Sequence, residues 1–260
     1  MSNVEWELCT RRNIRHSTFA NLHFAPVSRR WAVTSIQDVL QRTKTITFDC
    51  YGTLIDWSAG LCRSFSEIFG PAVAGHEREW FEAYVRIEAE VESGPHRSYR
   101  EVLAAVSERL ARRFHLSLPP GRERQLAEML PHWPPFPDTN EALLRLQRKF
   151  RLGVLSNIDR DLFAGTARQF GIAFDFVVTA EDVGSYKPAR AHFQRLIDAH
   201  GGAETALHVA QSLYHDGVPA NDLGLAFVWI NRYKEENHTT VRPLAEFPDL
   251  RSFADAACGS

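Results

Sequence analysis

The spacing of apolar positions changes along the chain and divides it into stretches of different predicted structure. Thr43–Phe48 is a short β-branched and apolar run, typical of a buried strand. Residues 58–130 instead repeat apolar side chains three, four and seven positions apart, which predicts helices and no strand. From Arg151 onward, short apolar runs alternate with helical stretches. That alternation predicts a parallel sheet covered by helices.

The helical stretch is interpreted as four helices that interrupt the sheet. The second is predicted over Glu77–Glu92, the third over Tyr99–Phe114 and the fourth over Arg122–Leu130. Four prolines between residues 131 and 137 cannot continue a helix, and they indicate a stiff linker back to the sheet.

The remaining elements follow in order. The predicted strands are Thr43–Phe48, Arg151–Ser156, Phe174–Thr179, Ala206–Ala210 and Ala226–Ile230. The helices between them are predicted over Asp161–Phe170, Ala189–His200 and around Ala220–Leu223. Asp138 is expected to cap the helix after the linker, with Glu141 three residues on in the capping-box position.

This order predicts an α/β protein with a Rossmann-like parallel sheet. Residues 43–57 and 137–260 form the core, and residues 58–136 form a four-helix cap over the ends of the strands. Residues 1–42 are expected to be a poorly ordered N-terminal extension with a short helix near Ser35–Gln41.

Composition narrows the function classes. A chain of 260 residues with 44% hydrophobic and 24% charged residues can bury a real core, and a net charge of −2 disfavours a nucleic-acid partner. No apolar run has the length of a membrane span, so no membrane partner is expected. The cysteines are scattered, with no Cys-x-x-Cys pair, which argues against a zinc site or disulfide framework and favours a cytoplasmic protein. The sequence leaves a homodimer open.

Candidate chemistry begins where the first predicted strand ends. Asp49 follows the apolar run directly, and Gly52 breaks the chain three residues later. A carboxylate at the carboxyl end of such a strand lies where open α/β sheets bind ligands. Because side chains alternate along a strand, Cys50 is expected to point away from Asp49 and pack behind it. A strand-end Asp that only caps a turn remains the simpler alternative for these residues alone.

The segment Asp49-Cys-Tyr51-Gly-Thr53-Leu-Ile-Asp56 resembles the first motif of the haloacid dehalogenase superfamily. In that family the first Asp is a covalent nucleophile, and a helical cap is inserted directly after the motif. Phosphatases of the family carry a second Asp as general acid/base where this chain has Tyr51. The variant with Tyr resembles the 2-haloacid dehalogenase branch more closely.

Three later segments match the other family motifs in order. Ser156 and Asn157 follow the second strand, where a hydroxyl and an amide can hold a carboxylate or phosphate, although such residues also populate ordinary turns. Lys187 lies in a Tyr-Lys-Pro segment that resembles the third motif. After the fourth strand, Asp216 matches the late carboxylate of the fourth motif, whereas Gln211 replaces the early one.

The resemblance implies a hydrolytic dehalogenase that acts on a short 2-haloacid, a small anionic substrate, through an aspartyl ester and without a cofactor. It implies these catalytic residues: Asp49, Thr53, Lys187 and Asp216. It implies these substrate-binding residues: Tyr51, Ser156, Asn157 and Gln211. Known haloacid dehalogenases also have an Arg early in the second cap helix that receives the halide. Here that position is Phe81 or Glu82, with Arg78 and Arg86 nearby.

Two alternatives stay open. A phosphatase of a small phosphorylated metabolite would form a phospho-aspartate at Asp49, with Mg²⁺ held by Asp49 and Asp216. A catalytically inactive binding protein is the other, and the presence of Asp49, Lys187 and Asp216 argues against it. The absence of one carboxylate at Gln211 weakens a magnesium site, because Mg²⁺ prefers hard oxygen ligands that include carboxylates.

Overall fold

The computed structural model describes residues 35–200 and 202–259. Within them, helix α2 (Ile36–Arg42) confirms the short helix predicted near Ser35–Gln41, and Ser35 caps it. The prediction of a poorly ordered extension otherwise falls on residues 1–34, which lie outside the described residues.

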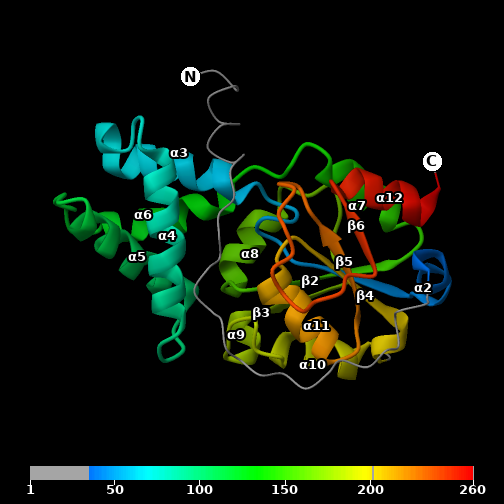
Figure 1. The fold of residues 1–260 in the computed structure, drawn as a ribbon. Coiled ribbons are helices and arrows are strands. Elements are labelled where there is room, and N and C mark those ends of the chain that lie inside the picture. Colours follow the sequence, from blue (N-terminus) through cyan, green and yellow to red (C-terminus); the bar gives the residue numbers. More distant parts are fainter. Residues whose placement is uncertain (1–34, 201, 260) are drawn as a thin grey trace.

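A six-stranded parallel sheet forms the body of the molecule, with strand order β3-β2-β1-β4-β5-β6 (Figure 1). Its strands are β1 (Thr45–Phe48), β2 (Arg151–Ser156), β3 (Phe176–Thr179), β4 (Ala206–Ala210), β5 (Ala226–Ile230) and β6 (Ala245–Phe247). The parallel α/β fold predicted from the sequence is therefore confirmed. The edge strand β6 was not predicted, because three residues of mixed polarity carry no alternation that sequence reading can use.

The helices around the sheet are α7 (Thr139–Leu146), α8 (Arg160–Ala167), α9 (Ala180–Val183), α10 (Ala191–Ala199), α11 (Val218–Asp222) and α12 (Leu250–Cys258). Shorter turns are η2 (Gly70–Ala72), η3 (Arg122–Arg124), η4 (Leu130–His132), η5 (Ala203–Thr205) and the π-helix η6 (Leu213–Gly217). Several predicted elements were too long. In α8, for example, the amides of Gln169 and Phe170 bond three residues back, to Thr166 and Ala167, so the α-helical pattern has already ended.

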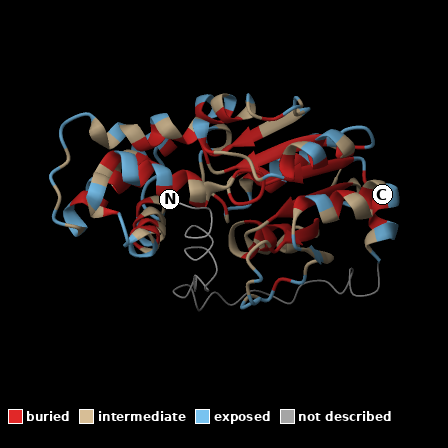
Figure 2. Cartoon of the chain, turned by 90° about the horizontal axis from the view of Figure 1, so that it is seen from above, coloured by how far each residue is buried: buried red, intermediate tan, exposed pale blue. Residues whose placement is uncertain are grey.

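Both faces of the sheet are buried, as the parallel topology requires. One face carries side chains such as Phe48, Val154 and Val209 and packs in the large core with helices α7 and α12. The other face carries Leu155 and Trp229 and packs with α10 and α11. Figure 2 shows the strands as buried ribbons between helices whose outer sides are exposed.

The helices predicted between β1 and the proline linker are α3 (Trp57–Phe69), α4 (Glu77–Glu92), α5 (Tyr99–Arg113) and α6 (Gln125–Met129). They lie together beside the sheet (Figure 1) and have an aromatic interior, in which Trp80 stacks on Phe114 with ring centroids 4.0 Å apart. Burial of such aromatic surface at helical spacing is what holds these helices together.

This helical group is fastened to the sheet by named contacts. Asp159, after β2, accepts hydrogen bonds from the amides of Tyr99 and Arg100 at 2.8 and 2.9 Å. The carboxylate therefore satisfies two amides at the start of α5 from another part of the chain. The proline linker returns along the loop after β1, where Asp56 N donates to Pro134 O at 2.8 Å.

Asp138 does not make the predicted capping box, because its carboxylate is used elsewhere. It accepts two hydrogen bonds from the Arg232 guanidinium, at 2.9 and 3.1 Å, and one from the Leu250 amide at 2.7 Å. Arg232 also donates to Thr53 O at 3.0 Å. A charged partner distant in sequence has therefore outcompeted the local cap. Among the described helices, none combines the length and apolar character needed to cross a membrane.

Candidate active site

The predicted site residues gather at the carboxyl ends of three neighbouring strands. Asp49 follows β1, Ser156 ends β2 and Gln211 follows β4, and β1 lies between the other two. This is the edge at which parallel sheets offer a ligand crevice. Cys50 is fully buried in the core cluster, as expected for the residue behind Asp49.

Lys187 joins two carboxylates at the centre of the site. Its Nζ donates to Asp49 Oδ1 at 2.9 Å, to Asp216 Oδ1 at 2.7 Å and to Leu155 O at 2.9 Å. The Lys187 side chain is only 2% exposed and that of Asp216 only 1%. All three ammonium hydrogens therefore have acceptors, and the cation is held in one place.

The turn after β1 orients Asp49 from the other side. Thr53 Oγ1 donates a hydrogen bond to Asp49 Oδ2 at 3.0 Å and accepts one from the backbone amide of Gln211 at 3.0 Å. The turn requires Gly52, whose φ is +96° and whose added Cβ would lie 3.3 Å from the Trp57 ring. Both oxygens of Asp49 thus have a fixed donor.

The buried charges shift one another's protonation. Burial raises the pKa of the Asp49 carboxyl above its usual value, and the Lys187 ammonium opposes that rise. Burial would also raise the pKa of Asp216, but Lys187 and a bond from His208 outweigh it and hold this pKa at about 2. Burial disfavours the charged form of Lys187, yet Asp216 and Asp49 raise its pKa to about 12. At neutral pH the ammonium is therefore present beside an ionised Asp216.

The four residues expected to bind substrate differ in what they already contact. The Asn157 side-chain oxygen accepts a hydrogen bond from the Lys187 backbone amide at 2.6 Å, and its side-chain nitrogen donates to Lys187 O at 3.1 Å. Asn157 therefore fixes the loop that contains Lys187. Gln211 Nε2 donates to Glu235 at 2.9 Å. Tyr51 OH pairs with Thr166 at 2.8 Å.

Ser156 is the exception among them. Its Oγ is completely buried and has no hydrogen-bond partner in the described part of the chain. A buried hydroxyl without a partner is uncommon, because the loss of its hydrogen bonds to water is not compensated. Such a group is available to a ligand that enters the crevice.

The donor set does not fit a divalent metal ion. The Lys187 ammonium already lies between Asp49 and Asp216, the two carboxylates a magnesium ion would share. Gln211 contributes an amide that is bonded to Glu235. In the described ranges, no three acidic, His or Cys side chains converge in a group suited to a metal. Mg²⁺ prefers several hard oxygen ligands, and here a side-chain cation has that position.

The helices beside the sheet bring acidic rather than basic groups toward this site. Glu88 of α4 accepts hydrogen bonds from Tyr84 and Tyr99 at 2.6 and 2.5 Å, and its burial raises its pKa. Burial also raises the pKa of Glu92, one turn further on, with Glu88 adding to the effect and Lys187 opposing it. The Glu92 carboxyl therefore lies within electrostatic range of Lys187.

No arginine of α4 takes the halide-receiving position that the family resemblance implies. Of the two residues predicted at that position, Phe81 has its ring 4.7 Å from that of Trp57. Arg78 pairs with Glu82 on the surface at 2.8 Å, and Arg86 is exposed. Both arginines near the predicted position are therefore on the surface.

Sequence reasoning missed His208. It is fully buried in β4, and it bonds Asp216 Oδ1 through Nε2 at 2.9 Å and Thr47 Oγ1 through Nδ1 at 2.9 Å. The available signal was a His inside an otherwise apolar strand, opposite a Thr two residues before Asp49 in the neighbouring strand.

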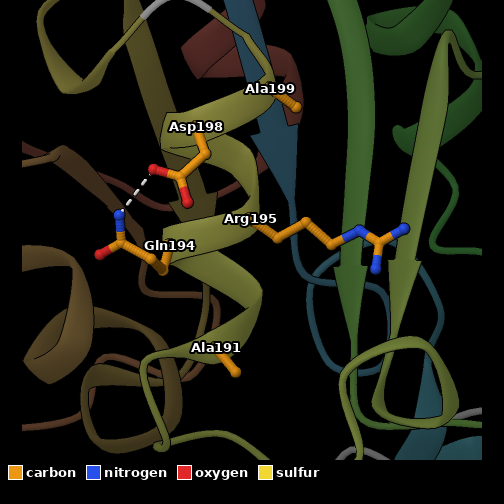
Figure 3. A pocket seen from close by; sticks show the side chains of 5 residues that line it. All are labelled: Ala191, Gln194, Arg195, Asp198 and Ala199. Carbon is orange, nitrogen blue, oxygen red and sulfur yellow. Dashed lines mark hydrogen bonds between the residues drawn. The ribbon is translucent and has the colours of Figure 1, made fainter.

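A surface hollow elsewhere, on the outer side of α10, contains none of these groups (Figure 3). Its lining residues are Ala191, Gln194, Arg195, Asp198 and Ala199.

Comparison with known proteins gives one family match. A family model described as haloacid dehalogenase-like hydrolase matches residues 43–210. A search of curated protein sequences finds no significant match.

Several solved structures have a similar fold. The L-2-haloacid dehalogenase RSc1362 is 23% identical, with a TM-score of 0.74 over 83% of this chain and 98% of its own. The L-2-haloacid dehalogenase from Xanthobacter autotrophicus with chloropropionic acid covalently bound is 18% identical, with a TM-score of 0.72 over 84% and 99%. The putative hydrolase YfnB from Bacillus subtilis, bound to magnesium, is 19% identical, with a TM-score of 0.71 over 83% and 99%. At such identities the likeness establishes the fold alone.

Proposed function

This chain belongs to the haloacid dehalogenase-like hydrolases, and from that membership we propose that it removes halide from a short 2-haloacid through an ester of Asp49. The observation that carries the proposal is the buried ammonium of Lys187, bonded to both Asp49 and Asp216. It favours ionised Asp49 next to an anionic substrate and replaces the metal ion that the phosphatase alternative requires.

In the first step, an oxygen of Asp49 attacks the carbon that bears the halogen. The new C–O bond forms as the C–halogen bond breaks, and the halide leaves with the bonding electron pair. No acid is needed, because halide is stable without a proton. Tyr51, in place of an acidic residue and bonded to Thr166 at 2.8 Å, is compatible with this step.

In the second step, water attacks the carbonyl carbon of the ester. We assign the acceptance of the water proton to Asp216, whose Oδ2 is buried and has no partner among the described residues. The ester C–O bond breaks, its electron pair stays on the product oxygen, and that oxygen takes the proton back. The remaining acid proton on Asp49 leaves to solvent, and the carboxylate is restored.

Substrate recognition is proposed from one hydroxyl without a partner and one buried positive charge. The unpartnered hydroxyl of Ser156 would bind the substrate carboxylate, and Lys187 would compensate its charge. Asn157 would act indirectly, because its amide fixes the Lys187 backbone. Gln211 and Tyr51 would border the crevice, since their polar atoms already have protein partners.

We propose that residues 58–136 act as a cap over this crevice and that no cofactor is required. The contacts of Asp159 with the start of α5 support a fixed position of this cap on the sheet. Exclusion of water by a cap would strengthen the electrostatic interaction between Lys187 and the reacting groups.

The test measures both chemistries in one design. The protein is incubated with chloroacetate and, separately, with an aryl phosphate, each with EDTA and with added Mg²⁺. We expect halide release that EDTA does not affect. The Asp49→Asn variant is expected to release no halide. Phosphate release that needs Mg²⁺ would replace the proposal with the phosphatase alternative.

Oxygen labelling tests the ester directly. With enzyme in excess in H₂¹⁸O, the ester route places ¹⁸O in Asp49 and unlabelled oxygen in the product, since water attacks the protein carbonyl. Label in the product of the first turnover would instead indicate direct attack by water on the carbon.

A further inference from the structure

His208 lies behind the catalytic groups, within the sheet itself. It belongs to β4 and faces Thr47 of β1 across the parallel ladder. Its ring is 0% exposed and packs edge-to-face against Phe193 of α10, with ring centroids 5.1 Å apart. Solvent therefore cannot supply hydrogen-bond partners to either ring nitrogen, and the neighbouring side chains must do so.

Both ring nitrogens have such partners, and these fix the tautomer. Nε2 lies 2.9 Å from Asp216 Oδ1, and an ionised carboxylate can only accept, so Nε2 carries the hydrogen. Nδ1 lies 2.9 Å from Thr47 Oγ1, whereas the other acceptor for that hydroxyl, Leu207 O, is 3.5 Å away. In the neutral ring the Thr47 hydroxyl therefore donates to Nδ1.

The consequence falls on Asp216. Its Oδ1 accepts from Lys187 at 2.7 Å and from His208 at 2.9 Å, whereas its buried Oδ2 has no partner in the described ranges. With Lys187 alone, the carboxylate could rotate and share the ammonium between its two oxygens. Lys187 and His208 both donate to Oδ1 of Asp216, and they come from different parts of the chain. Together they prevent this rotation and keep Oδ2 without a protein donor.

We propose that His208 is a positioning residue that holds Asp216 with Oδ2 free for the water that hydrolyses the ester. This inference rests on the proposed function. It assigns to His208 the second half of the reaction, because the first half needs Asp49 and Lys187 but no proton acceptor on Asp216. His208 is fully buried and does not line the crevice, so its effect on the reaction passes through Asp216.

Rapid-mixing kinetics separates the two halves. Halide release in the first turnover reports ester formation, and intact-protein mass reports the lifetime of the ester. In His208→Leu, halide release is expected within about threefold of the original rate, whereas hydrolysis slows about 10- to 100-fold, the effect of one hydrogen bond to a charged group. The ester, short-lived in the original protein, then accumulates.

His208→Gln is the matched rescue variant, because its side-chain amide keeps an N–H donor near the position of Nε2. Hydrolysis is expected to return to within about tenfold of the original rate, the worth of an ordinary hydrogen bond. Thermal unfolding of both variants checks that they are folded. Equal slowing of both halves, or no difference between Leu and Gln, would overturn the inference.

An NMR measurement tests the geometry of His208 independently of the proposed reaction. In protein labelled with ¹⁵N-histidine, His208 is expected as the Nε2–H tautomer, with an exchange-protected proton whose resonance moves in Asp216→Asn. The Nδ1–H tautomer, or an unchanged resonance, would refute the positioning geometry. If the protein releases no halide from any haloacid but this signature is present, the proposed function has failed and the His208–Asp216 geometry has not.

Discussion

Replacement of Lys187 by Met tests whether the two buried carboxylates depend on a single cation. Lys187 is 2% exposed and makes three hydrogen bonds, two of them to Asp49 and Asp216. Met fills most of the same volume, so the loss is mainly electrostatic. Removing one partner of a buried ion pair typically costs about 3–5 kcal/mol.

An independent estimate comes from proton uptake. Without the ammonium, burial and then repulsion by Asp216 disfavour the charged form of Asp49, so one of the two carboxylates binds a proton on folding. From an ordinary carboxyl pKa of 3.8, uptake of one proton costs about 4 kcal/mol at pH 7 and about 2 kcal/mol at pH 5. The two estimates agree at pH 7, and the second adds a pH dependence.

The sign of that dependence follows from proton linkage. The folded variant holds one proton more than its unfolded state, so its stability falls as the pH rises. Urea unfolding followed by tryptophan fluorescence at pH 5, 6, 7 and 8 measures the difference from the original protein. We expect this difference to grow by about 1.4 kcal/mol per pH unit. Lys187→Met combined with Asp216→Asn should reduce but not abolish the pH dependence, because the repulsion is gone while Asp49 stays buried without a cation.

Lys149→Met is the matched control. Lys149 Nζ donates to Ala257 O at 2.8 Å and lies 5.4 Å from the centre of the Phe150 ring, and among the described residues it pairs with no carboxylate. The free energy of unfolding of Lys149→Met should stay within about 1 kcal/mol of that of the original protein, and the difference should not depend on pH. A loss at Lys187 that stays constant from pH 5 to 8, or that matches the control, would refute the electrostatic reasoning.

Three further variants test how the fold supports the site. Gly60→Ala brings a Cβ to 2.2 Å from the Trp133 ring, and overpacking of about 1–3 kcal/mol should outweigh a helix-propensity gain of about 1 kcal/mol in urea unfolding. Asp138→Asn leaves the nearly buried Arg232 without its charged partner, and calorimetry should show a loss of about 3 kcal/mol. Asp159→Ala removes the acceptor for two amides of α5, which should cost about 1–2 kcal/mol and raise KM because the cap is held less firmly.

Each of these variants has a control with a similar substitution at an exposed or uncrowded position. Gly171→Ala meets no atom closer than 3.8 Å, and Glu141→Gln breaks only an exposed pair with Arg251. Asp161→Ala removes an exposed pair with Arg100 and one hydrogen bond from the Leu162 backbone amide at 2.8 Å. All three should stay within about 1 kcal/mol of the original protein. Equal effects in a variant and its control would show that the contact named for the variant is not the cause.

The sheet could be predicted because its strands are marked by local patterns. Arg151–Ser156, Ala206–Ala210 and Ala226–Ile230 are observed with the predicted bounds, as is helix Glu77–Glu92. Each is a continuous apolar run or a strong helical period. Parallel strands buried on both faces produce such runs in any sequence, and turn residues bound them.

The capping-box prediction at Asp138 was wrong because a partner distant in sequence binds the same carboxylate. Asp138 and Glu141 have the spacing of a capping box, yet Arg232, 94 residues further on, takes the carboxylate. Asn157 shows a similar competition: its side-chain amide already bonds the backbone of Lys187, and its role in substrate binding stays a prediction. A local pattern shows what a side chain can bind, whereas the fold decides which competing partner is closer.

His208 shows how far the same reasoning extends once the strand order is known. In the sequence it is one His in an apolar strand, and packing in the core would be the simpler interpretation. With β4 beside β1, the register places it opposite Thr47, two residues before Asp49, and within reach of Asp216. A buried imidazole must satisfy two ring nitrogens, so those neighbours determine which nitrogen faces the carboxylate. The orientation of Asp216 is therefore set by the pairing of two strands, and a change of register by one residue would turn His208 to the other face of the sheet.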